Sequence, residues 1–130
     1  SKITSISYYP EGTPGPAGTV LTVAFTLDGQ EFTALNGGPE YTFSQAISFY
    51  VNCNTQQEVD RLWEQLSDGG EIQQCGWLRD KYGVTWQIVP HILMDLLQSP
   101  DREKSNRVMQ AMLKMEKIDI ALLQQAYDQE

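Results

Sequence analysis

The 130-residue chain contains few residues that could act as nucleophiles or metal ligands. It has one histidine, His91, and two cysteines, Cys53 and Cys75. The cysteines stand far apart with no second ligand cluster near them, which is not a zinc pattern, and we expect two reduced, half-buried thiols. His91 follows Pro90 where a strand is predicted to turn into a helix. No acid or nucleophile is tied to this histidine by a motif, so we expect an incidental residue rather than a general base.

The sequence also lacks long apolar runs and an excess of basic residues. No run approaches the roughly 20 apolar residues that a membrane span needs, and no signal-peptide pattern opens the chain, so we expect a cytoplasmic protein that does not enter a membrane. Nine basic residues oppose 17 acidic ones, which gives a formal net charge of −8. This charge disfavours binding to nucleic acid. Hydrophobic residues make up 41% of the chain, enough for a core without a metal or disulfide.

The first third of the chain has the alternation of a β-sheet. Residues 2–9 and, most clearly, residues 19–27 alternate apolar and polar side chains. Asp28 with the following glycine is a hairpin signal, and residues 31–35 return as the partner strand. The Pro- and Gly-rich residues 10–18 form either a plain hairpin loop or a mobile segment that lines a site.

Residues 46–90 predict one strand, one helix and three more strands. Residues 46–52 alternate like a strand, and 55–67 form a helix with a Thr55–Glu58 capping box. Two glycines stop this helix. The apolar stripe of the helix consists of Val59, Leu62, Trp63 and Leu66. The strands that follow are predicted at residues 71–74, 76–79 and 84–89.

Residues 77–90 predict a hairpin of two aromatic strands around an acidic turn that contains Gly83. In the second strand Val84, Trp86 and Ile88 alternate with polar residues, so we expect that strand to bury one face.

The chain from residue 91 onward is predicted to be helical. A short amphipathic turn is followed by a longer helix that we expect Ser99 to cap, since proline occupies the next position. Asp119 can cap a last helix. The apolar side of the longer helix is assigned to Val108, Met109, Met112, Leu113 and Met115. This Met-rich stripe packs either on the sheet of its own chain or on another subunit.

Several motifs together resemble one protein family. They are residues 35–39, 49–51, Trp63, 69–70, 77–90 and 114–119. With these motifs the chain resembles the PhnB-like branch of the vicinal oxygen chelate superfamily, the superfamily of glyoxalase I, bleomycin-resistance proteins and extradiol dioxygenases. This branch carries the label 3-demethylubiquinone-9 3-methyltransferase. The Trp-Gln-Ile-Val-Pro run and the Lys-Ile-Asp tail are its most specific elements.

The resemblance implies an α+β glyoxalase-like fold of paired βαβββ modules with a helical C-terminal tail. Residues 1–45 would form an incomplete first module of three antiparallel strands, 46–90 the second module and 91–130 the tail, all within one structural domain. In relatives, a strand and a helix precede the position of Ser1. We expect either an upstream segment outside this sequence or a truncated form. A half-module with an unpaired edge leads us to expect a homodimer in which a partner covers that edge.

The resemblance also bears on metal binding. In glyoxalase-like members, His, Gln or Glu from the strands hold a divalent cation. The corresponding positions here are Phe32 or Ala34, Ala46 or Ser48, and Gln87. One weak amide donor does not hold a metal, so we expect no metal and no cofactor.

Without a metal, the sheet could still form a cleft for a small organic ligand. The candidate lining residues are Phe32, Asn36, Tyr50, Trp77, Trp86 and Gln87. The alternative for each aromatic residue is simple core packing. A buried amide needs partners, so Asn36 and Gln87 are expected to face a ligand, water or the backbone.

Three functions stay open at this stage, and catalysis is undecided. The chain is a metal-free protein that binds a small molecule, a metal-dependent enzyme that takes a ligand from an upstream strand, or a dimeric module whose tail recruits another protein. Methyl transfer from S-adenosylmethionine is rejected, because that chemistry uses a glycine-rich turn between a parallel strand and a helix. Here Gly37 and Gly38 end an antiparallel strand and precede Pro39.

Overall fold

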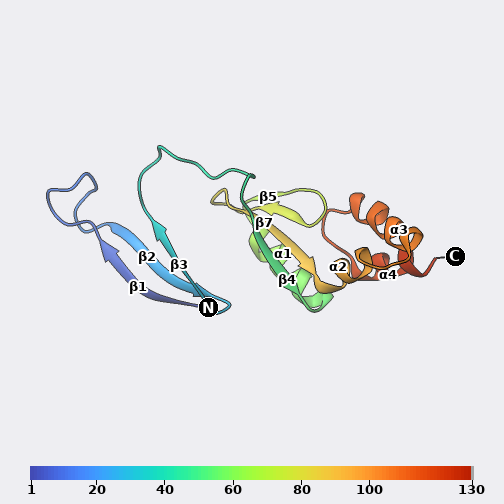
Figure 1. The fold of residues 1–130 in the computed structure, drawn as a ribbon. Helices are drawn as coiled ribbons and strands as arrows, with labels where there is room; N and C mark the ends of the chain where they lie inside the picture. The colour runs from blue at the N-terminus through green and yellow to red at the C-terminus, as the bar shows by residue number, and fades with distance from the viewer. Residues whose placement is uncertain (130) are drawn as a thin grey trace. The chain divides into compact units, whose positions relative to one another are not determined.

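A computed structural model describes residues 1–129 of the chain. These residues form two sheets and four helices, which confirms the predicted α+β class with a helical C-terminal tail (Figure 1). The chain divides into two compact units, Ser1–Thr42 and Phe43–Glu130, and each is described by itself. That both belong to one structural domain stays a prediction.

The first unit is a three-stranded antiparallel sheet in the order β1-β2-β3. Its strands are β1 (Lys2–Tyr8), β2 (Val20–Leu27) and β3 (Gln30–Leu35). The predicted Asp28-Gly29 turn is confirmed, with φ of 50° and 79°, because a two-residue type I′ turn needs positive φ at both positions. Residues 10–18 connect the paired strands β1 and β2, and therefore serve as a hairpin loop.

The first unit contains no buried residue among its 42 positions. Phe25 and Phe32 stack at 5.6 Å between ring centroids, but Ile3 and Leu35 are 62% and 67% exposed. Three strands need a packed apolar face to be stable in water. Residues 1–42 therefore do not form a packed core of their own.

The second unit contains a four-stranded sheet in the order β4-β7-β6-β5. β4 (Phe49–Cys53) runs parallel to β7 (Thr85–Pro90), while β6 (Trp77–Arg79) and β5 (Glu71–Ile72) are antiparallel to their neighbours. The strand, helix and three strands predicted here are confirmed, but three of the strands are shorter than expected. β4 begins at Phe49 rather than at residue 46, and the chain between β5 and β6 turns at Cys75, whose φ is 60°.

Helix α1 (Gln56–Ser67) begins and ends at the predicted signals. The Thr55 side chain accepts a hydrogen bond from the Glu58 amide. The Glu58 carboxylate in turn accepts from the Asn54 amide at 3.0 Å, one residue earlier than in a standard capping box. Gly69 has φ of 75° and terminates the helix, as glycine commonly does.

α1 covers one face of the second sheet, and its predicted apolar stripe is confirmed (Figure 1). Val59 and Trp63 pack on Leu78 and Ile88, with Leu62 and Leu66 beside them. The expectation that the last strand buries only one face is wrong. β7 is a central strand, and Val89, whose side chain points away from that of Ile88, is 3% exposed because it packs among the tail helices.

The tail consists of α2 (His91–Leu97), α3 (Arg102–Leu113) and α4 (Ile120–Asp128), which gather around one apolar core (Figure 1). Asp119 caps α4 as predicted. The Ser99 cap is wrong, since the Asp101 carboxylate accepts from the Lys104 amide at 3.2 Å and caps α3 instead. The core contains Val89, Leu93, Leu96, Val108, Met115, Ile118 and Leu123.

The tail packs on its own chain, which was one of the two alternatives for its apolar stripe. Val108, Met112 and Met115 join the tail core, whereas Met109 and Leu113, also predicted to lie on the apolar side, are 37% and 51% exposed. An α-helix of this length cannot turn all its apolar residues to one side, and these two face solvent.

Backbone contacts fasten the tail to the rest of the second unit. The Cys75 and Gly76 amides each donate at 2.8 Å to carbonyls of Met115 and Glu116. The Gln56 side chain donates to the Ile118 carbonyl at 3.0 Å and accepts from the Ile120 amide at 2.7 Å.

Lys117 pairs with Asp60 at 2.9 Å beside this contact. Hydrogen bonds from Gln56 and then Lys117 lower the pKa of Asp60. No helix within residues 1–129 is long and apolar enough to cross a bilayer.

Candidate functional site

The six predicted cleft residues are divided between the two units. Phe32 and Asn36 belong to the first unit, and Tyr50, Trp77, Trp86 and Gln87 to the second.

In the first unit, Asn36 faces the backbone. Its Nδ2 donates to the Val20 carbonyl at 3.0 Å, and its own carbonyl accepts a hydrogen bond from the Tyr9 hydroxyl. Phe32 stacks on Phe25 in the middle of the sheet. The backbone was one of the partners expected for the Asn36 amide, and these bonds tie the end of β3 to β2.

In the second unit, three predicted residues form one row across the sheet. Gln87 on β7 lies opposite Tyr50 on β4 and opposite Trp77 on β6. Residues paired across neighbouring strands point to the same face, so the three side chains share the face opposite α1. Gln87 Nε2 donates to Ser48 Oγ at 2.9 Å, which adds a hydroxyl to the row. We call Ser48, Tyr50, Trp77 and Gln87 the amide row.

Trp86 does not share this face. It packs against the α1-covered cluster, and its ring centroid lies 5.1 Å from that of Phe49. Its indole Nε1 donates to Asp80 Oδ2 at 2.9 Å. Adjacent residues of a strand point to opposite faces, so Trp86 and Gln87 cannot line the same cleft surface.

Asp80 organises the turn between the two aromatic strands. Its Oδ1 accepts from the Tyr82 and Val84 amides at 2.9 and 3.0 Å, while Oδ2 holds Trp86. Asp often caps turns by accepting from backbone amides of this kind. The sequence marked this turn as acidic, and the Asp with a Gly three residues later was the signal for this role.

Thr85 is a residue that sequence reasoning missed. It is 1% exposed and lies on the same face as Gln87, two positions along β7. Its Oγ1 has no hydrogen-bond partner within residues 1–129. A buried hydroxyl without a partner costs about 1–3 kcal/mol, so this face carries an unsatisfied polar group.

The four side chains of the amide row are neutral, and two of them are aromatic. Burial raises the pKa of the Tyr50 hydroxyl, which keeps it protonated as a donor. The same face also carries Arg79, which pairs with Glu71 at 2.6 Å. Arg79 is the β6 partner of Thr85. Such a surface can stack and hydrogen-bond a ligand, but offers no general base in the row itself.

The two cysteines differ in their surroundings. Cys53 is buried at the end of β4, and burial, followed by the charge of Glu58, raises the pKa of its thiol. Cys75 is half-buried in the turn before β6. Both are free thiols, as expected, but Cys53 is fully buried rather than half-buried.

Thiol titration of the folded protein is expected to show one fast-reacting cysteine, Cys75. Cys53 should react only on unfolding, since reaction needs an exposed thiolate. The measurement is the rate of absorbance change with Ellman's reagent, with and without denaturant. Cys75→Ser should remove the fast phase, and a fast phase that survives this change contradicts the assignment.

The comparison with family models identifies the relatives of this chain. Residues 1–89 match the family described as 3-demethylubiquinone-9 3-methyltransferase. The chain belongs to this family. The PhnB-like branch inferred from the motifs is thereby confirmed. The match ends within β7, so the tail helices lie outside it.

Solved structures agree with this family. A PhnB protein from Bacillus cereus, whose description carries the same methyltransferase label, is 41% identical over 68% of this chain and 78% of its own, with a TM-score of 0.62. A crystal structure of a Pseudomonas aeruginosa protein shares the fold at 19% identity, over 68% of this chain and 76% of its own, with a TM-score of 0.54. No curated protein matches the chain.

Proposed function

We propose that this PhnB-like protein binds a small organic molecule on the amide row without the help of a metal ion. The observation that carries the proposal is the placement of Tyr50, Gln87 and Trp77 side by side on the face opposite α1. Aromatic walls with a few fixed polar groups are what ligand pockets need.

The donors on this face do not fit a divalent cation. The resemblance places metal ligands at Gln87 and at either Ala46 or Ser48, and the Gln87 and Ser48 side chains are neutral and hydrogen-bond each other. Within residues 1–129, no three His, Cys, Asp or Glu side chains cluster closely enough to hold an ion. Hard cations prefer carboxylates and several oxygens, so we propose no metal-dependent step.

Methyl transfer is not part of the proposal either, although the family carries that label. Gly37 and Gly38 follow the antiparallel strand β3 and lead into Pro39, and no helix begins there. The one parallel pair within residues 1–129 is β4 with β7, and β7 ends at Pro90 directly before α2, with no glycine-rich turn between them. These turns therefore lack the glycine-rich backbone that would bind S-adenosylmethionine.

Gln87→Ala is expected to weaken ligand binding about tenfold while leaving the unfolding temperature of the free protein nearly unchanged. Gln87 is half-buried and loses one neutral hydrogen bond to Ser48, which contributes about 1 kcal/mol or less. The measurement is a thermal-shift screen of small aromatic compounds, followed by calorimetric titration of the strongest.

Gln65→Ala, an exposed residue of α1, is the matched control and should bind like the wild type. A large loss of stability in Gln87→Ala would make Gln87 structural. If no compound stabilises the wild-type protein, the proposal fails.

We also propose that the protein is a homodimer whose subunits cover the first sheet. The support is the absence of any buried residue in Ser1–Thr42, together with outer strands β1 and β3 that have no further strand beside them within residues 1–129. Ile6→Lys in β1, where Ile6 is 44% exposed, is expected to shift the protein from dimer to monomer.

Sedimentation velocity measures this shift. Ser5→Lys, at an exposed neighbouring position whose side chain points to the other face, is the control. A wild-type protein that sediments as a monomer at all concentrations contradicts the dimer.

A further inference from the structure

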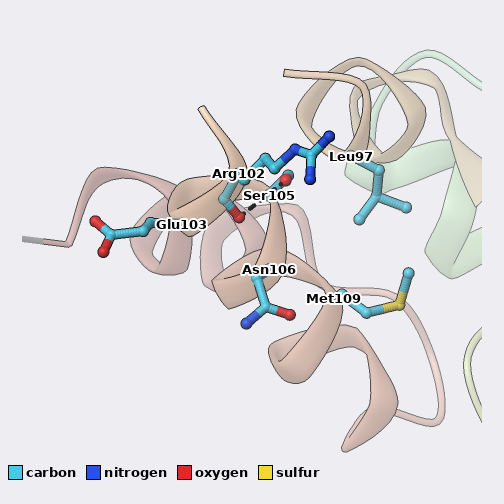
Figure 2. A pocket seen from close by; sticks show the side chains of 6 residues that line it. All are labelled: Leu97, Arg102, Glu103, Ser105, Asn106 and Met109. Carbon is cyan, nitrogen blue, oxygen red and sulfur yellow. Dashed lines mark hydrogen bonds between the residues drawn. The ribbon is translucent and has the colours of Figure 1, made fainter. Parts of the chain in front are cut away.

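The tail helices carry a groove that the proposed function does not use. The groove has a volume of about 520 Å³ and is open to solvent. It lies between the end of α2 and one side of α3 (Figure 2). Its lining residues are Leu97, Arg102, Glu103, Ser105, Asn106 and Met109.

Of the two apolar residues that line the groove, Leu97 packs against the tail core, whereas Met109 does not belong to it. α3 contributes Val108, Ala111 and Met112 to the core, while Met109 and Leu113 are 37% and 51% exposed one turn apart. All four methionines of the chain lie in the tail, and Met94 of α2 is also 43% exposed. Flexible thioether side chains suit surfaces that receive another helix.

The charged residues that line the groove are Arg102 and Glu103. Lys104 lies over the Tyr127 ring at 5.0 Å, and Arg107 donates to the Ala126 and Tyr127 carbonyls. Arg102 has no ion pair within residues 1–129. Figure 2 shows its guanidinium reaching towards Leu97, on the side of the groove where Met109 also lies, while the Glu103 carboxylate points away.

Arg102, Asn106, Met109 and Leu113 follow one another along a single face of α3, because their spacing repeats every three to four residues. At 1.5 Å per residue, the guanidinium end and the Met109 end lie roughly 10 Å apart, which is two helical turns. This face of α3 therefore has a positive end and an apolar end that lie two helical turns apart.

We propose that this groove binds an amphipathic helix of another protein that carries a carboxylate two turns from an apolar pair. The apolar pair packs on Leu97, Met109 and Leu113, and the carboxylate accepts hydrogen bonds from Arg102, with Asn106 as a further donor. Charge complementarity selects this occupant, since Arg102 is the α3 cation whose side chain has no partner within residues 1–129, and it lies beside Leu97 and Met109 in a chain of net charge −8. This inference is independent of the small-molecule proposal.

The test is fluorescence anisotropy of the full chain with synthetic helical peptides about 18 residues long, a length that sustains a helix. Each peptide carries two Leu residues one helical turn apart and one Glu residue two turns away from them. The Glu precedes the Leu residues in one peptide and follows them in the other. Each peptide has a control in which Gln replaces the Glu. We expect one of the two Glu peptides to bind saturably, and the matching Gln peptide to bind roughly threefold to tenfold more weakly.

Arg102→Gln should remove the difference between the Glu and Gln peptides. Met109→Ser should weaken both about tenfold. The controls are Arg61→Gln on α1 and Gln110→Ala on α3, both at exposed positions outside the groove, and neither should change binding. Circular dichroism confirms that the variants keep their helices.

Three results would overturn the proposal. The first is that neither Glu peptide binds saturably, and the second is that the Glu and Gln peptides bind equally. The third is that Met109→Ser converts a wild-type dimer into a monomer in sedimentation velocity. The last result would assign the groove to a second copy of this chain.

Discussion

Gly70→Ala is expected to destabilise the second unit by at least about 3 kcal/mol, the range of severe overpacking. A Cβ at this position would overlap the Arg79 carbonyl oxygen and lie 2.8 Å and 2.9 Å from the carbonyl carbon and Cα of Asp80. These are backbone atoms at the start of the turn that Asp80 organises, so the overlap cannot be relieved by rotating a side chain. The chain after α1 must instead move away from β6, which disturbs β5 and the turn together.

Chemical denaturation followed by tryptophan fluorescence measures this loss, because all three tryptophans lie in the second unit. Gly37→Ala is the matched control, since a Cβ there would meet only Leu35 at 3.8 Å and Gly37 does not have a positive φ. A Gly70→Ala protein with the midpoint of the wild type would show that this turn yields easily.

Ile118→Ala is expected to cost about 2–5 kcal/mol, as for other buried Ile residues cut back to alanine. Ile118 is 0% exposed in the tail core, and the Cα of Gly76 lies against it so closely that a Cβ there would be 3.0 Å from its Cγ1. Its carbonyl accepts from Gln56. Loss of this side chain leaves a cavity where the tail meets both the sheet and α1.

The same denaturation experiment with circular dichroism checks this prediction, and the helical signal should unfold together with the tryptophan signal. Leu122→Ala on α4 removes a side chain that is 50% exposed, and should change the free energy of unfolding by no more than about 1 kcal/mol. Equal midpoints for the two variants would mean that the tail core is not as closely packed as described.

The elements with a strong local pattern could be predicted from sequence. α1 has a capping residue, a complete apolar stripe and a glycine stop, and all three agree with the structure. The Asp28-Gly29 hairpin was equally clear, since its backbone needs residues that accept positive φ. These signals lie within a few residues of one another, where sequence spacing and physical contact coincide.

The errors occurred where two local signals competed. Ser99 before Pro100 and Asp101 before Arg102 are both acceptable helix starts; in the structure Asp101 caps α3, and the Ser99 hydroxyl is hydrogen-bonded to Tyr127 of α4. The apolar side predicted for α3 also included two exposed residues, Met109 and Leu113. Which methionines are buried depends on helices far along the chain.

The candidate site could be predicted only in part. Tyr50, Trp77 and Gln87 are brought together by cross-strand pairing, which the sequence suggested through the order of its elements. The face on which Trp86 lies follows from alternation alone, since it must point away from Gln87. The unpartnered Thr85 hydroxyl and the bond from Gln87 to Ser48 depend on side-chain positions, which no sequence pattern supplied.

The Gln56 side chain can form its hydrogen bonds to the tail only late in the synthesis of the chain. Its two partners, Ile118 and Ile120, lie 62 and 64 residues later in the chain. At a translation rate of 5–20 residues per second, they are added roughly 3–13 s after Gln56. During that interval the first turn of the nascent α1 has its cap at Thr55 but not its hydrogen bonds to the tail. A ribosome-bound chain that stops before Ile118 should therefore expose this end of α1 to chaperones, and release should follow only when the tail has emerged.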